Sequence, residues 1–250
     1  TPFESTYEPM PQTNTLFRGA NIYDGEGNEF LDTDLLIKDG KIIAIGKDLP
    51  ASSEFTVVDA AGKWITPGII DIHSHMGVYS APGVTTSSDG NESTSPVTAD
   101  VWAEHSIWVQ DPQFALALKG GITSFHVLPG SANLIGGRGV TAKNVQRNTI
   151  NSMKFPNAPH SLKMACGENP KRVYGNKSQA PSTRMGNIAG YRKSWIKAEA
   201  YLSRLDEYES KSEEAKEFSY KPTRDLDLET LAGVLQCALL IQYISYISCL

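Results

Sequence analysis

Short apolar runs separated by turn residues fill the first quarter of the chain. They lie at residues 16–23, 34–38, 41–46 and 56–59. The two middle runs are separated by Asp39-Gly40, a pair typical of a two-residue β-hairpin turn. We therefore expect a small β-rich unit over residues 14–66. The polar, Pro-rich segment before it, residues 1–13, lacks periodicity and predicts a disordered or extended tail.

After Pro67 the pattern changes to longer elements. Residues 69–73 form a continuous apolar run, as expected for a strand in a sheet that is covered on both faces. Residues 112–119 predict a helix that ends at a Gly-Gly pair, and residues 122–128 predict the next buried strand. A strand, a helix and a strand in this order favour parallel βαβ units.

The rest of the chain predicts further elements of both kinds. Residues 78–99 are rich in Ser, Thr, Gly and Pro, so we expect a long exposed loop there. The remaining segments are read as a Gly-rich irregular stretch at 133–144, a strand at 161–166, a long charged helix at 191–218, a short helix at 228–235 and an apolar, β-branched run at 239–247.

Composition narrows the class of protein only slightly. The chain has 250 residues, 40% of them hydrophobic, and a net charge of −5, which is ordinary for a soluble globular protein. It shows no basic stripe, so we expect no nucleic-acid partner. The oligomeric state is left open. The chain opens at Thr1, which resembles a processed N-terminus or the cut end of a longer chain. Processing would favour a periplasmic or secreted location.

The C-terminal segment has some features of a transmembrane helix. Residues 231–250 carry no charge and are about long enough to cross a bilayer. They also contain Gln and Ser residues and lack a flanking aromatic and basic belt on the far side. We therefore expect no membrane partner.

Two histidines at the end of the 69–73 run are the main chemical signal. His73 and His75 are separated by one residue, and alternate residues of a strand point to the same side. Both imidazoles can therefore reach one metal ion. Imidazole is a favoured ligand of zinc, although other divalent metals remain open. Asp71 shares this face and could support the ligands from behind.

Three segments in this order resemble the amidohydrolase superfamily, most closely its imidazolonepropionase-like group. They are residues 38–46, 67–75 and 117–124, and the likeness extends over about residues 14–235. The resemblance implies an α/β fold: the N-terminal part of a (β/α)8 TIM-type barrel over residues 67–250, with a small composite β-sandwich domain, built from both chain ends, to which residues 14–66 belong. It also implies a small-molecule substrate and hydrolysis of a C–N bond in a non-peptide amide, cyclic amide or amidine by metal-activated water.

Other candidate site residues are open to two interpretations each. Glu168 follows a strand, and some members of the superfamily have a strand-end Glu as a further metal ligand, but it could equally stabilise a turn. His126 could line the pocket or be a satisfied structural histidine. Arg138, in a Gly-rich segment, and Arg172 could bind substrate or stabilise turns. His105 and His160 are not expected to be ligands.

The chain also departs from the family pattern. The resemblance implies later strand-end histidines and a general-base Asp, yet no histidine follows His160, so we identify no catalytic residue. From about residue 236 the sequence keeps its apolar composition but becomes atypical, as in a truncated chain or a shifted reading frame. About half a barrel fits this length. We expect an incomplete, inactive fragment; the alternatives are a non-catalytic paralogue and a metal-binding module using His73, His75 and Glu168.

Overall fold

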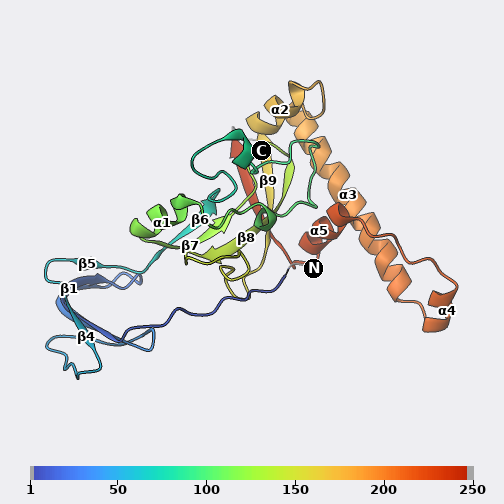
Figure 1. The fold of residues 1–250 in the computed structure, drawn as a ribbon. Coiled ribbons are helices and arrows are strands. Elements are labelled where there is room, and N and C mark those ends of the chain that lie inside the picture. Colours follow the sequence, from blue (N-terminus) through green and yellow to red (C-terminus); the bar gives the residue numbers. More distant parts are fainter. Residues whose placement is uncertain (1–2, 247–250) are drawn as a thin grey trace. The chain divides into compact units, whose positions relative to one another are not determined.

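The computed structural model describes residues 3–246, shown in Figure 1. The chain divides into two compact units. The small unit is Glu8–Ile69, and the large unit consists of Thr1–Tyr7 together with Ile70–Leu250. The described N-terminal residues are bound to the large unit: the Thr6 N–H donates to the Asn151 carbonyl at 2.9 Å.

The small unit is built from one mixed sheet. Its strands are β1 Thr15–Tyr23, β2 Glu29–Lys38, β3 Lys41–Gly46, β4 Thr56–Asp59 and β5 Trp64–Ile65. Their order is β3-β2-β1-β4, and β5 also pairs with β1. β1, β2 and β3 are antiparallel neighbours, whereas β4 and β5 run parallel to β1. Asp39 and Gly40 both have positive φ, at 51° and 72°, which confirms the predicted hairpin turn.

The expected sandwich is not seen in this unit. The described residues of the small unit form one sheet rather than two stacked sheets. Ile42, Ile43 and Val57 keep 61%, 53% and 53% of their surface exposed. A second sheet would cover such side chains, so the unit shows only the single layer.

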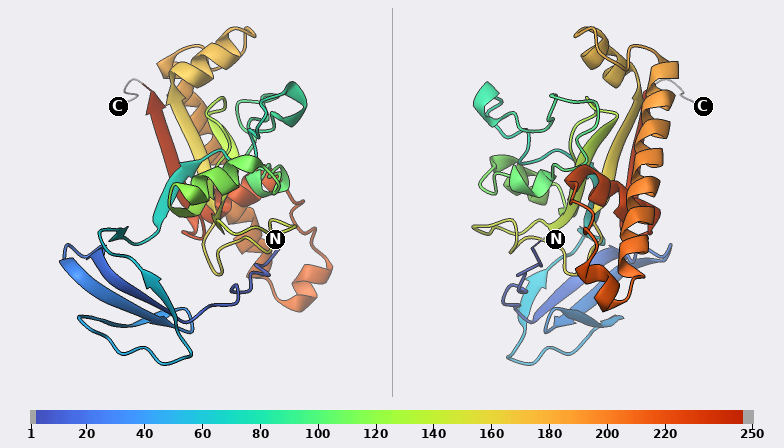
Figure 2. Two further views of the ribbon diagram at one scale, coloured as in Figure 1. Left: turned by 60° about the vertical axis from the view of Figure 1, so that its left-hand side comes forward. Right: turned by 90° about the vertical axis from the view of Figure 1, so that its right-hand side faces the viewer.

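The large unit contains the second sheet. Its strands are β6 Ile69–Ser74, β7 Ile122–Val127, β8 Ile135–Lys143, β9 Ser161–Gly167 and β10 Leu240–Tyr246, in the order β10-β9-β8-β7-β6. Figure 2 shows β10 at the edge of the sheet beside β9. The helices are α1 Pro112–Lys119, α2 Glu168–Gly175, α3 Arg184–Glu209, α4 Glu213–Glu217 and α5 Leu226–Leu235. The strands predicted at 122–128 and 161–166 are confirmed, as is the helix at 112–119.

Other predictions need adjustment at their boundaries. The charged helix begins at Arg184, earlier than predicted, and ends at Glu209, with α4 as a separate short helix. In residues 78–99 the structure has only a 3-10 turn, Thr85–Ser87, besides loop and isolated bridges. Within residues 3–246 no helix has the length and apolarity needed to cross a membrane. Residues 231–235 end α5, 240–246 form β10, and 247–250 lie outside the described residues.

The two faces of the large sheet carry different side chains, and one of them is mostly apolar. On one face, Phe125 and Val127 of β7 and Val140 and Ala142 of β8 pack with Phe114 of α1. A second cluster joins β9 to α3 and α5. Alternate residues of these strands belong to the opposite face. We call that opposite face the inner face; it carries the described residues His126, Thr141, Ser161 and Lys163.

The prediction of an irregular stretch at 133–144 is wrong, because residues 135–143 form the strand β8. β8 runs antiparallel to both β7 and β9, whereas β9 and β10 are parallel. Its glycines allow close approach: a Cβ on Gly137, where φ is +111°, would lie 2.3 Å from the Val101 carbonyl oxygen. The glycines thus let a strand pass close to its neighbours, instead of forming a loop.

Candidate metal and active site

His73 and His75 lie together at the end of β6. Their rings meet edge to face, with centroids 5.1 Å apart. The His75 Nδ1 lies 2.8 Å from the Leu128 carbonyl oxygen, so Nδ1 carries the proton and Nε2 keeps its lone pair. The Asp71 side chain accepts a hydrogen bond from the His73 backbone N–H at 3.0 Å, and this bond holds the backbone at the end of β6 in place. One imidazole is therefore already held in the tautomer that can bind a metal through Nε2.

Both histidines are held in the neutral form. Burial lowers the pKa of His73, and the charge of Lys163 lowers it further. Burial also lowers the pKa of His75, and this outweighs the hydrogen bond to Leu128. Neutral imidazole is the metal-binding form. The pair is thus ready to bind a divalent metal without first losing protons at neutral pH.

Lys163 is a site residue that the sequence interpretation missed. Its side chain lies in the middle of β9, is fully buried, and donates from Nζ to the Pro129 carbonyl at 3.0 Å. Burial lowers its pKa to about 8. Its charge acts on both members of the histidine pair. A lysine inside an otherwise apolar strand was the signal that could have identified it.

His126 lies on the inner face with both ring nitrogens engaged. Nδ1 is 2.8 Å from the Thr141 Oγ1, and Nε2 is 2.6 Å from the Ser161 Oγ. Burial, followed by the charges of His160, His73 and Lys163, lowers its pKa to about 4. His126 borders a hollow of about 500 Å³ that is lined from β6, β7, β8, β9 and β10. Ile70 and Ile72 line this hollow from β6. His126 is near enough to His73 for the charge of His73 to lower its pKa, and it is also fixed by its two hydrogen bonds.

Glu168 begins α2, and Arg172 lies one turn further along the same helix. The Glu168 side chain is 58% exposed, and its Oε1 lies 3.8 Å from the Arg172 Nε. Arg172 also donates to the Asn169 Oδ1 at 3.3 Å. Among the residues that the structure describes, no group of three or more His, Cys, Asp or Glu side chains is placed to hold a metal ion. The structure does not bring Glu168 to the histidine pair, and its role as a third ligand stays a prediction.

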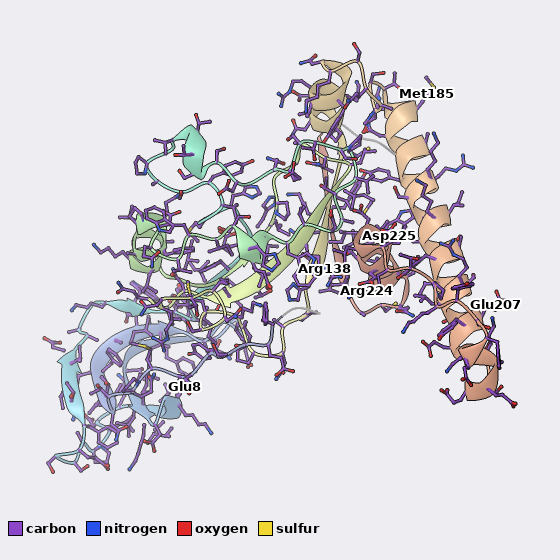
Figure 3. All side chains as sticks on the ribbon, turned by 45° about the vertical axis from the view of Figure 1, so that its right-hand side comes forward. Glu8, Arg138, Met185, Glu207, Arg224 and Asp225 are labelled. Carbon is purple, nitrogen blue, oxygen red and sulfur yellow. The ribbon has the colours of Figure 1, made fainter. Side chains whose placement is uncertain are left out.

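Arg138 lies on the opposite face of the sheet. Its Nε donates to the Thr230 Oγ1 at 2.9 Å, and its guanidinium lies 4.5 Å from the centroid of the Trp102 ring. Figure 3 shows it beside α5. On this face His105 and His160 flank the buried Glu104, at 3.6 and 4.0 Å. The structure therefore brings together His73, His75, His126 and Lys163, but not Arg138, Arg172 or Glu168.

Comparison with known proteins finds similar sequences and a similar fold. No family model matches the chain. It is 32% identical over 246 residues to the amidohydrolase tasK of Hapsidospora irregularis, which covers 92% of this chain. Its fold matches the crystal structure of an amidohydrolase from Thermotoga maritima MSB8, with a TM-score of 0.79, 35% identity and 92% of this chain covered. The chain belongs to the amidohydrolase superfamily.

The match covers only part of the other amidohydrolases. The chain spans 25% of the tasK protein and 57% of the Thermotoga chain. A shorter likeness, 40% identity over 63 residues, relates it to a dihydroorotase from Geotalea daltonii, of which it covers 15%. As in the sequence analysis, the chain corresponds to the N-terminal part of the amidohydrolase fold: an α/β half-barrel with mixed sheets.

Proposed function

We propose that this chain supplies the N-terminal part of a metal-dependent amidohydrolase that hydrolyses a C–N bond in a non-peptide amide, cyclic amide or amidine. The observation that carries the proposal is the neutral pair His73 and His75 at the end of β6, in a fold that matches the Thermotoga amidohydrolase. Zinc is the expected metal because imidazole nitrogen is among its preferred ligands. The proposed partner is a small-molecule substrate.

The donor chemistry of the pair fits a divalent metal in part. His73 and His75 would hold the ion, which when bound supplies an activated water and polarises the scissile carbonyl. Catalytic zinc sites have three protein ligands, and the described residues provide two at this position. The positive charge of Lys163 repels a cation bound at this pair. Binding of a metal here therefore needs anionic groups beside the two histidines to offset that repulsion. Residues of this chain bind and orient, and we assign no proton transfer to them.

Metal binding tests the first half of the proposal. We expect the purified chain, dialysed against zinc, to retain metal measured by inductively coupled plasma mass spectrometry. The double variant His73→Ala/His75→Ala should lose most of it, because two of the ligands are removed. His105→Ala, which changes a histidine on the opposite face, is the control and should retain the metal. Equal zinc content in all three proteins would exclude a specific site at the pair.

Turnover tests the second half. The chain alone is proposed to be an inactive fragment, since a third ligand and a general base are not identified in it. A chimera in which this chain replaces the matched 57% of the Thermotoga amidohydrolase should hydrolyse members of a panel of amides, cyclic amides and amidines. The same chimera with His73→Ala should be inactive. A folded, zinc-loaded chimera that hydrolyses nothing in the panel would favour a non-catalytic paralogue instead.

A further inference from the structure

A hollow of about 440 Å³ lies where β9 ends and α2 begins, and its lining is cationic. Lys171, Arg172 and Arg184 line it, together with a single carboxylate, that of Glu168. Lysine and arginine are cations at neutral pH, whereas an ionised glutamate only accepts hydrogen bonds. The other lining residues are neutral: Gly167, Asn176 and Ser182. The lining therefore carries two more positive charges than negative ones.

Two helix starts meet around this hollow. α2 begins at Glu168, directly after Gly167, and α3 begins at Arg184. The two helices lie side by side (Figure 1), and a Cβ on Gly175 would lie 3.4 Å from the Ser182 Cβ. Gly167 has no side chain that could accept a hydrogen bond from the first N–H groups of α2. These N–H groups therefore add to the positive potential that the side chains produce.

The cations of the lining are only weakly neutralised by neighbouring acids. Lys171 forms no ion pair with the residues that the structure describes. Arg172 is paired with Glu168, but the contact is long, at 3.8 Å, and both side chains are 58% exposed. Exposed pairs of this kind contribute about 1 kcal/mol at most. An anion that enters the hollow can therefore compete with Glu168 for the guanidinium of Arg172.

We propose that this hollow binds a dianionic phosphoryl group, supplied by free phosphate or by a phosphorylated small molecule. A phosphoryl group carries about −1.5 to −2 charges at pH 7, which matches the excess of the lining better than the single charge of a carboxylate does. The guanidinium fork of arginine binds two phosphate oxygens at once, and lysine adds a point charge. The volume also lies in the range of small-molecule sites, about 300–1,000 Å³, which leaves room for an organic part.

The hollow lies at the same edge of the large sheet as the histidine pair. β7 and β9 both run antiparallel to β8, so they are parallel to each other. The Leu128 N–H donates to the Ser74 carbonyl at 3.0 Å, which joins the ends of β7 and β6. The lining nevertheless contains neither His73 nor His75. Phosphoryl binding can therefore be measured apart from metal binding and turnover, and its outcome is independent of the proposed function.

Calorimetric titration of the full chain, without added metal, tests the proposal. Inorganic phosphate and glycerol phosphate are the probes, and acetate at the same ionic strength is the carboxylate control. We expect saturable binding of the phosphoryl probes and at least tenfold weaker binding of acetate. Tighter binding of glycerol phosphate would identify a phosphorylated molecule as the ligand, whereas tighter binding of inorganic phosphate would identify the free ion.

Charge variants locate the site. Lys171→Met/Arg172→Met should weaken phosphate binding about tenfold or more, because two cations leave the lining. Glu168→Gln should tighten it, because the carboxylate that repels the anion is removed, and a misfolded protein cannot show this gain. The control is Lys197→Met, which removes an exposed charge about 20 Å along α3 from Arg184 and should bind phosphate like the wild type. Absence of saturable binding, equal affinity in all four proteins, or binding of acetate as tight as that of phosphate would overturn the proposal.

Discussion

At the residue scale, His126 connects pH to stability. Unfolded histidine binds a proton near pH 6.5, whereas the pKa of His126 in the fold is about 4. Between these values the unfolded state binds more protons, so stability falls as the pH falls through this window. We expect titration by NMR of labelled histidine to show His126 neutral down to about pH 4. His126→Gln should reduce the loss of stability between pH 6.5 and 4, and an unchanged loss would contradict the assignment.

The ion pair of Glu104 and Lys154 offers a second residue-scale prediction. The Lys154 Nζ lies 2.6 Å from the Glu104 Oε2, with side chains that are 5% and 2% exposed. Lys154→Met would leave the carboxylate buried without its partner, which costs about 3–5 kcal/mol. Urea unfolding measures this cost. Lys216→Met is the control: its partners Glu209 and Glu213 are exposed, so losing these ion pairs should change the stability far less.

At this scale, the sequence could not predict which residues of different strands lie next to one another, because that depends on how the strands align in the sheet. The period of two along one strand placed Asp71, His73 and His75 on a common side. Lys163 was not predicted as a neighbour of the pair, because its position depends on how β9 aligns with other strands. Arg138 was a candidate because of its charge and its glycine neighbours. The structure shows that its strand turns it toward Trp102 and Thr230 instead.

At the element scale, the glycines of β8 give a direct test. Gly137→Ala would place a methyl group 2.3 Å from the Val101 carbonyl oxygen, so we expect a loss of about 3 kcal/mol or more in unfolding free energy. Gly62→Ala is a matched control, because Gly62 also has positive φ (+70°) but would meet nothing within 4 Å. Its cost should be limited to backbone strain, about 1–2 kcal/mol. Equal losses would show that contact with Val101 does not matter.

Elements were predictable where local signals were sufficient. α1 has the bounds that the sequence predicts, because Asp111 accepts a hydrogen bond from the Gln113 N–H at its start and Gly120 follows its end. β8 was not predicted, because glycines alone look like a loop and only the nearby Val101 backbone explains them. Figure 3 shows Met185 near the start of α3 and Glu207 near its end. The helix therefore begins before residue 191, where the charged stretch predicted its start.

At the scale of the whole molecule, the motifs were more informative than the pattern of elements. The half-barrel followed from the resemblance carried by residues 67–75 and 117–124, and the Thermotoga structure supports it. A sandwich was inferred in the same way, yet the described residues of the small unit form a single sheet. A second layer depends on other segments, which the local sequence of residues 14–66 cannot specify.

The two units should respond differently to acid. Asp34 in the small unit is 5% exposed, and burial opposes its ionisation. The N–H groups of Gly19 and Leu49 and the guanidinium of Arg18 outweigh burial and lower its pKa. A carboxyl whose pKa is lowered by folding gives stability above its unfolded pKa, and this is lost as the pH falls below about 4.

The large unit, in contrast, loses the contribution of His126 already between pH 6.5 and about 4. Incorporation of fluorotryptophan would separate the units, because Trp64 lies in the small unit while Trp102, Trp108 and Trp195 lie in the large one. Fluorine NMR should therefore show the large-unit signals changing at higher pH than the signal of Trp64. Asp34→Asn should move the Trp64 transition to a lower urea concentration at pH 7 and remove its dependence on pH below 4. Simultaneous change of all four signals at every pH would show that the units unfold as one.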